Sequence, residues 1–557
     1  MRYGGDMVRS QLSVEPGSPE EIARFKALQR RMRDMFLRFR GNQGHPHTAV
    51  VVPSLSLDPR ELAKIDGVAH YEERSLFNLM LLRLPRLRVI YVTSKRLAPS
   101  VVDYYLHHMR GVPPDHARRR LLLLDCDDAS PRPLTQKILE RPRVLERLRE
   151  GILNPEWAHI VVFNSTPLER TLAVELGIPL YACDPDLSFL GTKTGSREAF
   201  ADAGIPMPPG RENLADVDAL VEGVADLWEE HPETQRMVVK LNDGFSGEGN
   251  AILDLRQLEQ IRPGASGAID RRDGIRQALP QLRFEAKGEV WEHFAQKFQD
   301  MGGICECWLE GEDKASPSCQ LRITPAQEVQ SISTHDQVLG GASGQVFQGA
   351  TFPAHGSYRL RVQEMGKTVG RVLADKGAIG RFSVDFLAIR KDDPTEVPDL
   401  YAVEINLRQG GTTHPFNTLK FLTDGTYDEE TGLFYTAQGQ RREYFATDTL
   451  CHPEYKGLLP MDLIDLLVTN GVHFRSDETG VVFHLMGCLS EFGKVGCTSI
   501  APTVGEAQRF YDEMVILLDR YTGRSDGLDT SGRIEALGSA DELRIPAEML
   551  DYDESEL

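Results

Sequence analysis

Four short apolar runs in the first 185 residues constrain the fold of this chain most strongly. Helical stretches such as TPLERTLAVELGI separate these runs, which are TAVVVPSL (48–55), LRVIYVTS (87–94), RLLLLDCDD (120–128) and HIVVFNST (159–166). Runs this short and apolar are typical of strands buried on both faces of a parallel sheet. Their alternation with helices predicts an open α/β domain over residues 1–185. No glycine-rich phosphate-binding turn follows any of these runs, so we expect no nucleotide in this domain.

The pattern changes near Gly191, where strand-like runs become longer and more polar. The runs are RMVVKLNDGFSGEGNAILDL (236–255), ICECWLEGE (304–312), SCQLRITP (318–325), RFSVDFLAIR (381–390) and LYAVEINLRQ (400–409). We therefore expect an α/β and α+β multidomain protein. Its second region would cover residues 186–450 and a small C-terminal α+β block residues 451–523. Residues 524–557 would form an acidic, solvated tail, for which we expect disorder.

Two of these strands carry polar side chains on one face. In VEINLR, Val403, Ile405 and Leu407 alternate with polar residues, and KDDPTEVPD has the composition of a hairpin loop to the preceding strand. Antiparallel pairing would bring Asp385 beside Glu404 and Asn406. Three oxygen donors without histidine or thiolate suit Mg²⁺. The alternative is a pair of half-exposed strands with ordinary polar faces.

A glycine-rich loop follows Lys240 in KLNDGFSGEGN. Its backbone N–H groups, around Ser246, Gly247 and Gly249, could fold over phosphates while Lys240 supplies positive charge. The loop is not a P-loop, because the lysine comes before the glycines and no helix follows them. An ordinary turn is the alternative.

A third stretch, ECWLEGE, could form an adenine-binding linker. Glu306 opens it, and Trp308 and Leu309 follow with apolar side chains that could enclose a purine ring while the backbone contacts its edge. Taken alone, the stretch is an amphipathic strand.

Together and in this order, the three stretches resemble the ATP-grasp ligases over about residues 186–420. The resemblance implies a set of nucleotide-binding side chains: Lys193, Lys240, Glu306, and either Glu310 or Asp313 at the ribose. It implies a metal set formed by Asp385, Glu404 and Asn406. It also implies that Arg408, with Lys240, faces the transferring phosphate during catalysis.

The flanking sequences narrow the resemblance. GGTTHP, after the metal strand, and YKGLLPMDLIDLL with GVVFHLMGCLSEFGKVGCTSI look like the peptide ligase of pheganomycin biosynthesis and its relatives. This resemblance implies an ATP-grasp fold after a pre-ATP-grasp domain, with ATP and two Mg²⁺ ions as cofactors. It implies an ADP-forming carbon–nitrogen ligase that joins an amino acid, peptide or other carboxylate to an amine through an acyl phosphate.

The acid substrate is expected beside the metals. Candidate contacts to its carboxylate are Gln320, Arg322, Arg381 and His414, with a packing role as the alternative for each. Two other functions stay open, an ATP-grasp kinase or phosphotransferase and a non-catalytic ATP-binding module. The resemblance is also compatible with a homodimer.

Composition sets further limits. The formal net charge of −20 argues against extended contact with nucleic acid, which needs clustered Lys and Arg. No run has the length and apolarity of a membrane span, and MRYGGDMVRS lacks the apolar core of a signal peptide, so we expect a cytoplasmic protein. The eight scattered cysteines, including Cys305 and Cys307, are expected to be packed, reduced thiols.

Overall fold

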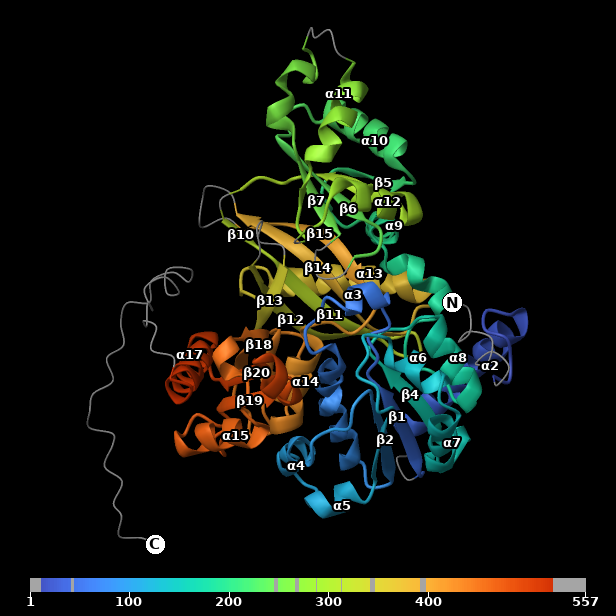
Figure 1. Ribbon diagram of the computed structural model, residues 1–557, viewed down its shortest axis with the longest axis vertical. Helices are drawn as coiled ribbons and strands as arrows, with labels where there is room; N and C mark the ends of the chain where they lie inside the picture. Colours follow the sequence, from blue (N-terminus) through green and yellow to red (C-terminus); the bar gives the residue numbers. More distant parts are fainter. Residues whose placement is uncertain are drawn as a thin grey trace, which may run out of the picture.

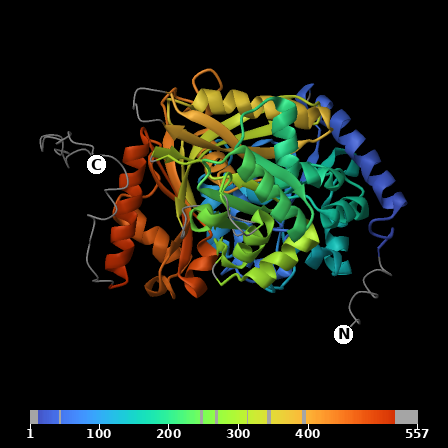
Figure 2. The same cartoon turned by 90° about the horizontal axis from the view of Figure 1, so that it is seen from above.

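The computed structural model describes residues 12–41, 45–244, 249–265, 270–286, 288–311, 313–340, 346–390 and 397–523. Within these ranges the chain forms an N-terminal α/β domain, an upper lobe and a large sheet that continues into the C-terminal block (Figure 1). Seen from above, helices α2 (Pro19–Gly41) and α17 (Val504–Tyr521) lie at opposite edges of the molecule (Figure 2).

The N-terminal domain has the parallel sheet that its apolar runs predict. Its four strands pair in the order β3-β2-β1-β4, with bounds β1 (His47–Val52), β2 (Leu87–Thr93), β3 (Leu121–Asp125) and β4 (Ala158–Val162). All six residues of β1 are buried, as expected of a strand covered on both faces.

Helices cover this sheet, and capping residues and prolines in the sequence mark where several of them begin. The elements are α2, α3 (Pro59–Leu62), η1 (Val68–Arg83), α4 (Pro99–His107), α5 (Pro114–Arg118), α6 (Leu134–Leu139), α7 (Pro142–Gly151) and α8 (Pro167–Leu176). Thr166 and Glu169 form a reciprocal capping box at the start of α8, with proline at the first helical position. Helix α8 begins five residues after β4 ends, and its Leu172 and Ala173 share an apolar core with residues of the sheet.

The upper lobe is a second sheet with helices packed against it. Its strands pair in the order β5-β9-β6-β7-β8, with bounds β5 (Gly210–Leu214), β6 (Arg236–Leu241), β7 (Asn250–Asp254), β8 (Arg283–Phe284) and β9 (Gly303–Cys307). The helices are α9 (Lys193–Ala203), α10 (Val217–Glu230), α11 (Arg271–Ala278) and α12 (Trp291–Met301). The lobe has its own apolar core around Trp228 and Phe298.

The largest sheet has nine strands in the described part of the chain. They are β10 (Asp313–Ala315), β11 (Pro317–Ile323), β12 (Val329–Gly340), β13 (Val346–Phe352), β14 (Gly380–Arg390), β15 (Asp399–Asn406), β18 (Glu443–Cys451), β19 (Gly480–His484) and β20 (Lys494–Ala501). The path runs β10-β14-β11-β12-β13-β18-β20-β19, and β15 pairs with β14. The sheet therefore continues across residue 451, where the sequence suggested a separate C-terminal block.

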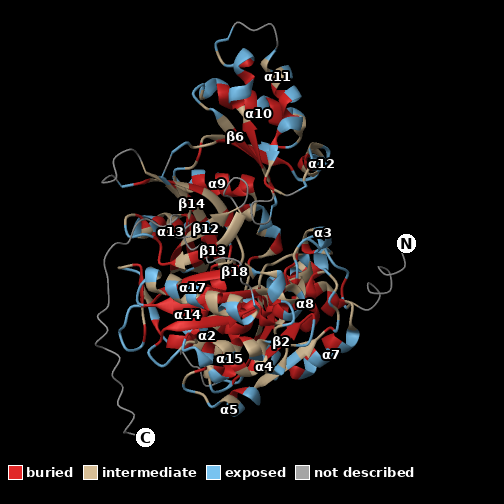
Figure 3. Ribbon diagram, turned by 60° about the vertical axis from the view of Figure 1, so that its left-hand side comes forward, coloured by how far each residue is buried: buried red, intermediate tan, exposed pale blue. Residues whose placement is uncertain are grey.

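Helices and a small hairpin complete this half of the molecule. They are α13 (Arg359–Asp375), α14 (Thr413–Thr423), α15 (Pro460–Thr469), α16 (Leu489–Phe492), α17, β16 (Thr426–Asp428) and β17 (Leu433–Tyr435). Helix α14 is buried along nearly its whole length (Figure 3). One apolar core contains Tyr104 and Tyr105 of the N-terminal domain together with Phe416 and Phe483, so that domain and the C-terminal strands pack as one body.

Two further sequence expectations concern the whole chain. Among the described residues, no helix has both the length and the apolar character required to cross a membrane. All eight cysteines are free thiols, and each except Cys451 is buried. The tail at 524–557 lies outside the described residues.

Candidate active site

A cleft of about 2200 Å³ lies where the upper lobe, the large sheet and the N-terminal domain meet. The upper lobe contributes Lys193 and Lys240, and the large sheet contributes Asp385, Glu404 and Asn406. The remaining walls include these residues of the N-terminal domain, strand β18 and helix α17: Tyr71, Arg74, Phe163, Glu443, Asp448 and Tyr511. The N-terminal domain, the upper lobe and the large sheet therefore all contribute side chains to the cleft.

Strands β14 and β15 form the floor of the cleft in the predicted antiparallel pairing. Asp385 lies opposite Glu404, and Ser383 opposite Asn406. The Asn406 amide donates to Oδ2 of Asp385 at 3.0 Å, while the Ser318 hydroxyl donates to Oδ1 at 2.6 Å. The three predicted oxygen donors are therefore neighbours on one surface.

One detail of this pairing differs from the sequence prediction. A β-bulge interrupts the register between Asp385 and Phe386, so that β15 has one extra residue, Val403, at this point. Strict alternation predicts Val403 on the face opposite Glu404, yet both residues line the cleft. The bulge locally redirects the strand beside the carboxylates.

The charges on the cleft floor are only partly compensated. The Nζ of Lys193 lies 2.5 Å from Oε1 of Glu404. Burial raises the pKa of Glu404, but the cations Lys193, Arg408 and Lys240 together outweigh burial, and the net shift is downward. Burial and the facing Glu404 carboxylate raise the pKa of Asp385 to about 6. Two carboxylates in so small a space favour an added cation.

Arg408 follows the end of β15 and lines the same cleft. Its guanidinium lies 6.0 Å from the centre of the Phe163 ring and donates to the carbonyl oxygen of Gln409 at 3.1 Å. Burial lowers the pKa of Arg408, although the neighbouring carboxylates of Glu404 and Asp385 act in the opposite direction. A guanidinium keeps its proton in proteins, so Arg408 acts as a cation here.

At the upper end of the cleft, Glu306 is the centre of a buried ion-pair group. Its Oε2 lies 2.6 Å from Nζ of Lys240, and its Oε1 lies 2.7 Å from Nη1 of Arg197. Burial raises the pKa of Glu306, but the two cations outweigh it and leave the pKa below its ordinary value. Arg197, which the sequence prediction missed, lies in α9, 109 residues before Glu306.

Trp308 and Leu309 also line this end of the cleft. The Trp308 ring carries the Arg236 guanidinium at 4.8 Å and the Lys314 ammonium at 5.0 Å from its centre. These cations fix the indole beside the cleft.

The ribose assignment stays open between two acidic residues. Glu310 pairs with Arg236 at 2.5 Å, and Asp313 pairs with Arg390 at 2.8 Å. Neither residue is part of the described cleft lining.

The glycine-rich loop is described at its base. Gly244 and Gly249 lie so close that a methyl group built on either would be 3.4 Å from the other, and the N–H of Leu241 donates to the carbonyl of Gly249 at 3.0 Å. The predicted phosphate-binding residues Ser246 and Gly247 lie outside the described residues.

The four predicted contacts to an acid substrate do not line the cleft. Gln320 bonds to the hydroxyls of Thr412 and Thr413, and its amide nitrogen donates to Thr412. Arg322 donates to Gln330 and lies directly opposite Arg381 on the neighbouring strand.

Two of these four have further buried neighbours. Arg381 donates to Asn417 at 3.3 Å, and its Nη1 has no protein partner. His414 is held in a buried cluster with Asp448 and His484. A substrate role for these four residues therefore stays a prediction.

Comparison with known proteins finds a match over the residues that form the cleft floor and the upper lobe. The model of the IQCH-like ATP-grasp family matches residues 186–270 and 275–430, the region that carries the resemblance in the sequence. A relative from Streptantibioticus cattleyicolor, L-propargylglycine–L-glutamate ligase, is 29% identical over 463 residues, which is 82% of this chain and 90% of that protein. Residues 186–430 of this chain are thus similar to an ATP-grasp region, and most of the chain is similar to a protein named as a ligase.

Three other matches cover further parts of the chain or its fold. The PGM1 C-terminal domain model matches residues 462–514, inside the predicted C-terminal block. IQ motif-containing protein H of Danio rerio is 24% identical over 418 residues, 68% of this chain, but this chain matches only 39% of that longer protein. The biotin carboxylase of Campylobacter jejuni shares the fold with a TM-score of 0.51 at 12% identity, covering 87% of this chain and 96% of that one. The predicted fold class is confirmed.

Proposed function

We propose that the protein is an ATP-dependent carboxylate–amine ligase that forms a peptide or peptide-like amide bond through an acyl phosphate. The relative named L-propargylglycine–L-glutamate ligase supports amino acids or short peptides as the substrate class. The released products are ADP and inorganic phosphate.

The observation that carries this proposal is the group of charges on the cleft floor. Asp385 and Glu404 face each other across two strands, and Lys193 compensates only Glu404 directly. Arg408 lines the same cleft. A group with two carboxylates, an ammonium and a guanidinium is suited to hold a metal–polyphosphate pair.

The donor set fits magnesium. Asp385, Glu404 and Asn406 offer oxygen atoms, and among the described residues the side chains bonded to Asp385 carry neither thiolate nor imidazole. Bound there, Mg²⁺ would neutralise charge on the phosphates and hold the γ-phosphate in line with its attacker.

The proposed reaction has two steps. First, a carboxylate oxygen of the acid substrate attacks the γ-phosphorus of ATP, the bond from that phosphorus to the β,γ-bridging oxygen breaks, and ADP leaves with an acyl phosphate formed. Then the amine nitrogen attacks the acyl carbon, the carbon–oxygen bond to phosphate breaks, and the nitrogen loses a proton. Arg408 would stabilise the charge on the transferring phosphoryl group, and Lys240 would bind the phosphates from the opposite wall.

Hydroxylamine trapping tests the proposal. The purified chain would be incubated with ATP, Mg²⁺, hydroxylamine and a panel of amino acids, short peptides and other carboxylic acids. We expect hydroxamate and ADP in equal amounts with at least one acid, and loss of both in Glu404→Ala and Arg408→Ala. The matched control is Arg371→Ala, because Arg371 is exposed on α13 and should keep full activity.

Other products would point to other functions. AMP in place of ADP would contradict the acyl-phosphate route. Phosphorylated product that hydroxylamine cannot convert would favour a phosphotransferase. ATP binding without turnover, even with cell extract added as a substrate source, would favour a non-catalytic nucleotide-binding module.

A further inference from the structure

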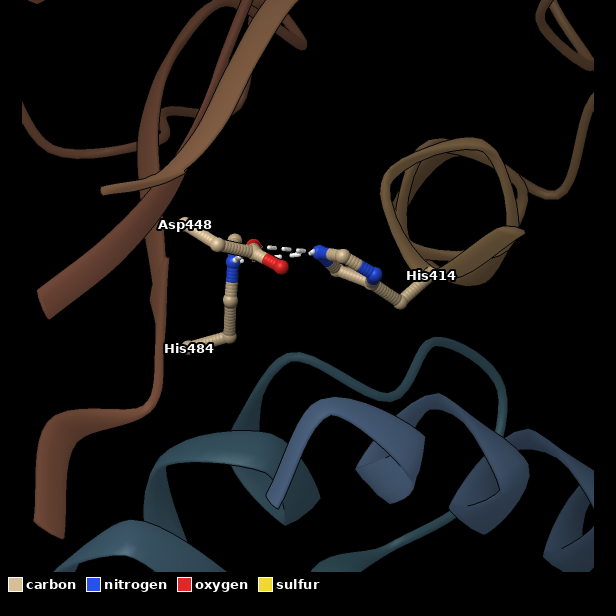
Figure 4. A group of neighbouring side chains, drawn as sticks. All are labelled: His414, Asp448 and His484. Carbon is tan, nitrogen blue, oxygen red and sulfur yellow. Dashed lines mark hydrogen bonds and ion pairs between the residues drawn. The ribbon is translucent and has the colours of Figure 1, made fainter. Parts of the chain in front are cut away.

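Three buried side chains from three separate elements point at one another (Figure 4). His414 comes from helix α14, Asp448 from strand β18 and His484 from the last position of β19. The Nε2 of His414 lies 2.9 Å from Oδ1 of Asp448 and 3.1 Å from Nε2 of His484. The Nε2 of His484 lies 2.5 Å from the same Oδ1. Two imidazole nitrogens and one carboxylate oxygen thus form a single small triangle.

Hydrogen bonds alone explain only part of this triangle. If both imidazoles donate to Oδ1, their two N–H hydrogens crowd each other at that oxygen. The short contact between the two nitrogens is then not a hydrogen bond, because neither nitrogen has a free lone pair. If one nitrogen instead accepts from the other, it no longer donates to Asp448. A cation at the centre would receive a lone pair from each atom and account for all three contacts.

We propose that His414, Asp448 and His484 bind a divalent transition-metal ion, with zinc as the first candidate. Two imidazoles with one carboxylate form a donor set that zinc and its neighbours prefer, whereas Mg²⁺ takes oxygen ligands. Tetrahedral zinc at about 2.0–2.2 Å from each ligand would separate the donor atoms by about 3.3 Å. The triangle, with sides of 2.5–3.1 Å, has to open by less than an ångström.

The surroundings of the triangle keep these donors in place. Nη1 of Arg74 lies 3.0 Å from Oδ2 of Asp448, which leaves Oδ1 for the triangle, and the Arg74 guanidinium is itself held over the Tyr71 ring at 4.4 Å. Outer partners of this kind orient metal ligands. A methyl group on Gly496 would lie 2.1 Å from Nε2 of His484, so only glycine there leaves room for this imidazole.

The position of the site indicates what the ion would do. It would join α14, which begins shortly after Arg408, to the strands of the C-terminal block. Three protein ligands leave a coordination position for a further group. Asp448 lines the cleft, and the ion with Arg74 would outweigh its single negative charge, so water or a carboxylate is the expected fourth ligand. The site does not depend on the proposed ligase activity.

Metal analysis of the purified full-length chain tests the proposal directly. Elemental analysis should find about one equivalent of zinc or a similar metal per chain. After removal with a chelator, Co²⁺ added in the presence of excess Mg²⁺ should bind with one equivalent and give the visible absorption of cobalt with imidazole ligands. The His414→Ala/His484→Ala double variant should bind Co²⁺ at least 100-fold more weakly, and Gly496→Ala should also weaken it.

The control removes a different buried imidazole. His335 bonds to the Tyr444 hydroxyl at 2.6 Å, and His335→Phe should keep the cobalt spectrum even if the fold becomes less stable. A folded double variant that keeps the metal would overturn the proposal. If the double variant does not fold, the wild-type titration still decides, because the absence of saturable cobalt binding there would also overturn it.

Discussion

The two ends of the cleft hold their charges in different ways. At the upper end of the cleft, called the hinge here because it carries the predicted adenine-binding linker, the Glu306 carboxylate has a cation on each oxygen, Lys240 on one and Arg197 on the other. On the floor, two carboxylates, Asp385 and Glu404, face each other and only the latter has a lysine within ion-pair distance. The hinge group is complete without a ligand, whereas the floor group gains most from an added cation. We therefore expect changes at the hinge to affect stability and changes on the floor to affect turnover.

The largest effect is expected when the hinge group loses its carboxylate. Glu306→Gln leaves Lys240 and Arg197 without their shared partner in a buried place, which should destabilise the upper lobe by roughly 3–5 kcal/mol. Denaturant unfolding followed by tryptophan fluorescence would measure this change, because Trp228, Trp291 and Trp308 all belong to this part of the chain.

The control for that measurement is an exposed ion pair nearby. The Glu310 side chain, which pairs with Arg236, is 44% exposed. We therefore expect Glu310→Gln to lower the free energy of unfolding by about 0–1 kcal/mol. Equal losses in the two variants would mean that burial does not distinguish the hinge group.

On the floor, the largest effect should fall on turnover. Arg408→Ala removes a cation expected to stabilise the transferring phosphoryl group, and kcat for ADP formation should fall by about 10²–10³-fold. The unfolding midpoint should change little. A large loss of stability with unchanged kcat would instead make Arg408 a structural residue, and Arg371→Ala again serves as the control for loss of a guanidinium.

A smaller effect with opposite signs should follow from Asp385→Asn. Like charges directly opposite on paired strands are destabilising, so removing one should stabilise the protein by about 0.2–1 kcal/mol. The same change replaces a charged carboxylate ligand of the expected Mg²⁺ site by a neutral amide, and turnover at low Mg²⁺ should fall more than at high Mg²⁺. If the Asp385→Asn variant is less stable but fully active, the expectation that floor residues act on turnover and hinge residues on stability is wrong. Asp375→Asn, at an exposed position of α13, is the matched control.

Much of the fold and the cleft floor can be predicted from the sequence, because both depend on local periodicity. The apolar runs of the N-terminal domain lie in one parallel sheet, and the E-x-N spacing places Glu404 and Asn406 on one surface. The bulge at Val403 was not predictable, since nothing in a strand's alternation marks where one residue is left unpaired.

The remaining site residues depend on long-range contacts. Arg197 reaches Glu306 only through the packing of α9 against the upper sheet. The cluster around His414 unites residues 34 and 70 positions apart, without the short spacing that marks many metal sites in a sequence. The continuity of the large sheet was also missed, because the sequence divided the chain near residue 451, between β18 and β20, which pair with each other.

The smallest predicted effect would decide which acidic residue contacts the ribose. Arg236 pairs with Glu310 and also lies over the Trp308 ring, so Glu310 is close to the predicted adenine-binding linker. Asp313 instead forms an ion pair with Arg390 on a neighbouring strand. We therefore expect Glu310→Gln to raise the Kd for ATP about two- to fivefold, the size of one hydrogen bond, and Asp313→Asn to leave it within about twofold. Binding of ATP and of a deoxyribose analogue would be compared by calorimetry. If Glu310 contacts the sugar hydroxyl, its variant should no longer discriminate between the two nucleotides; the reverse pattern would assign the ribose to Asp313 and confine Glu310 to holding Arg236.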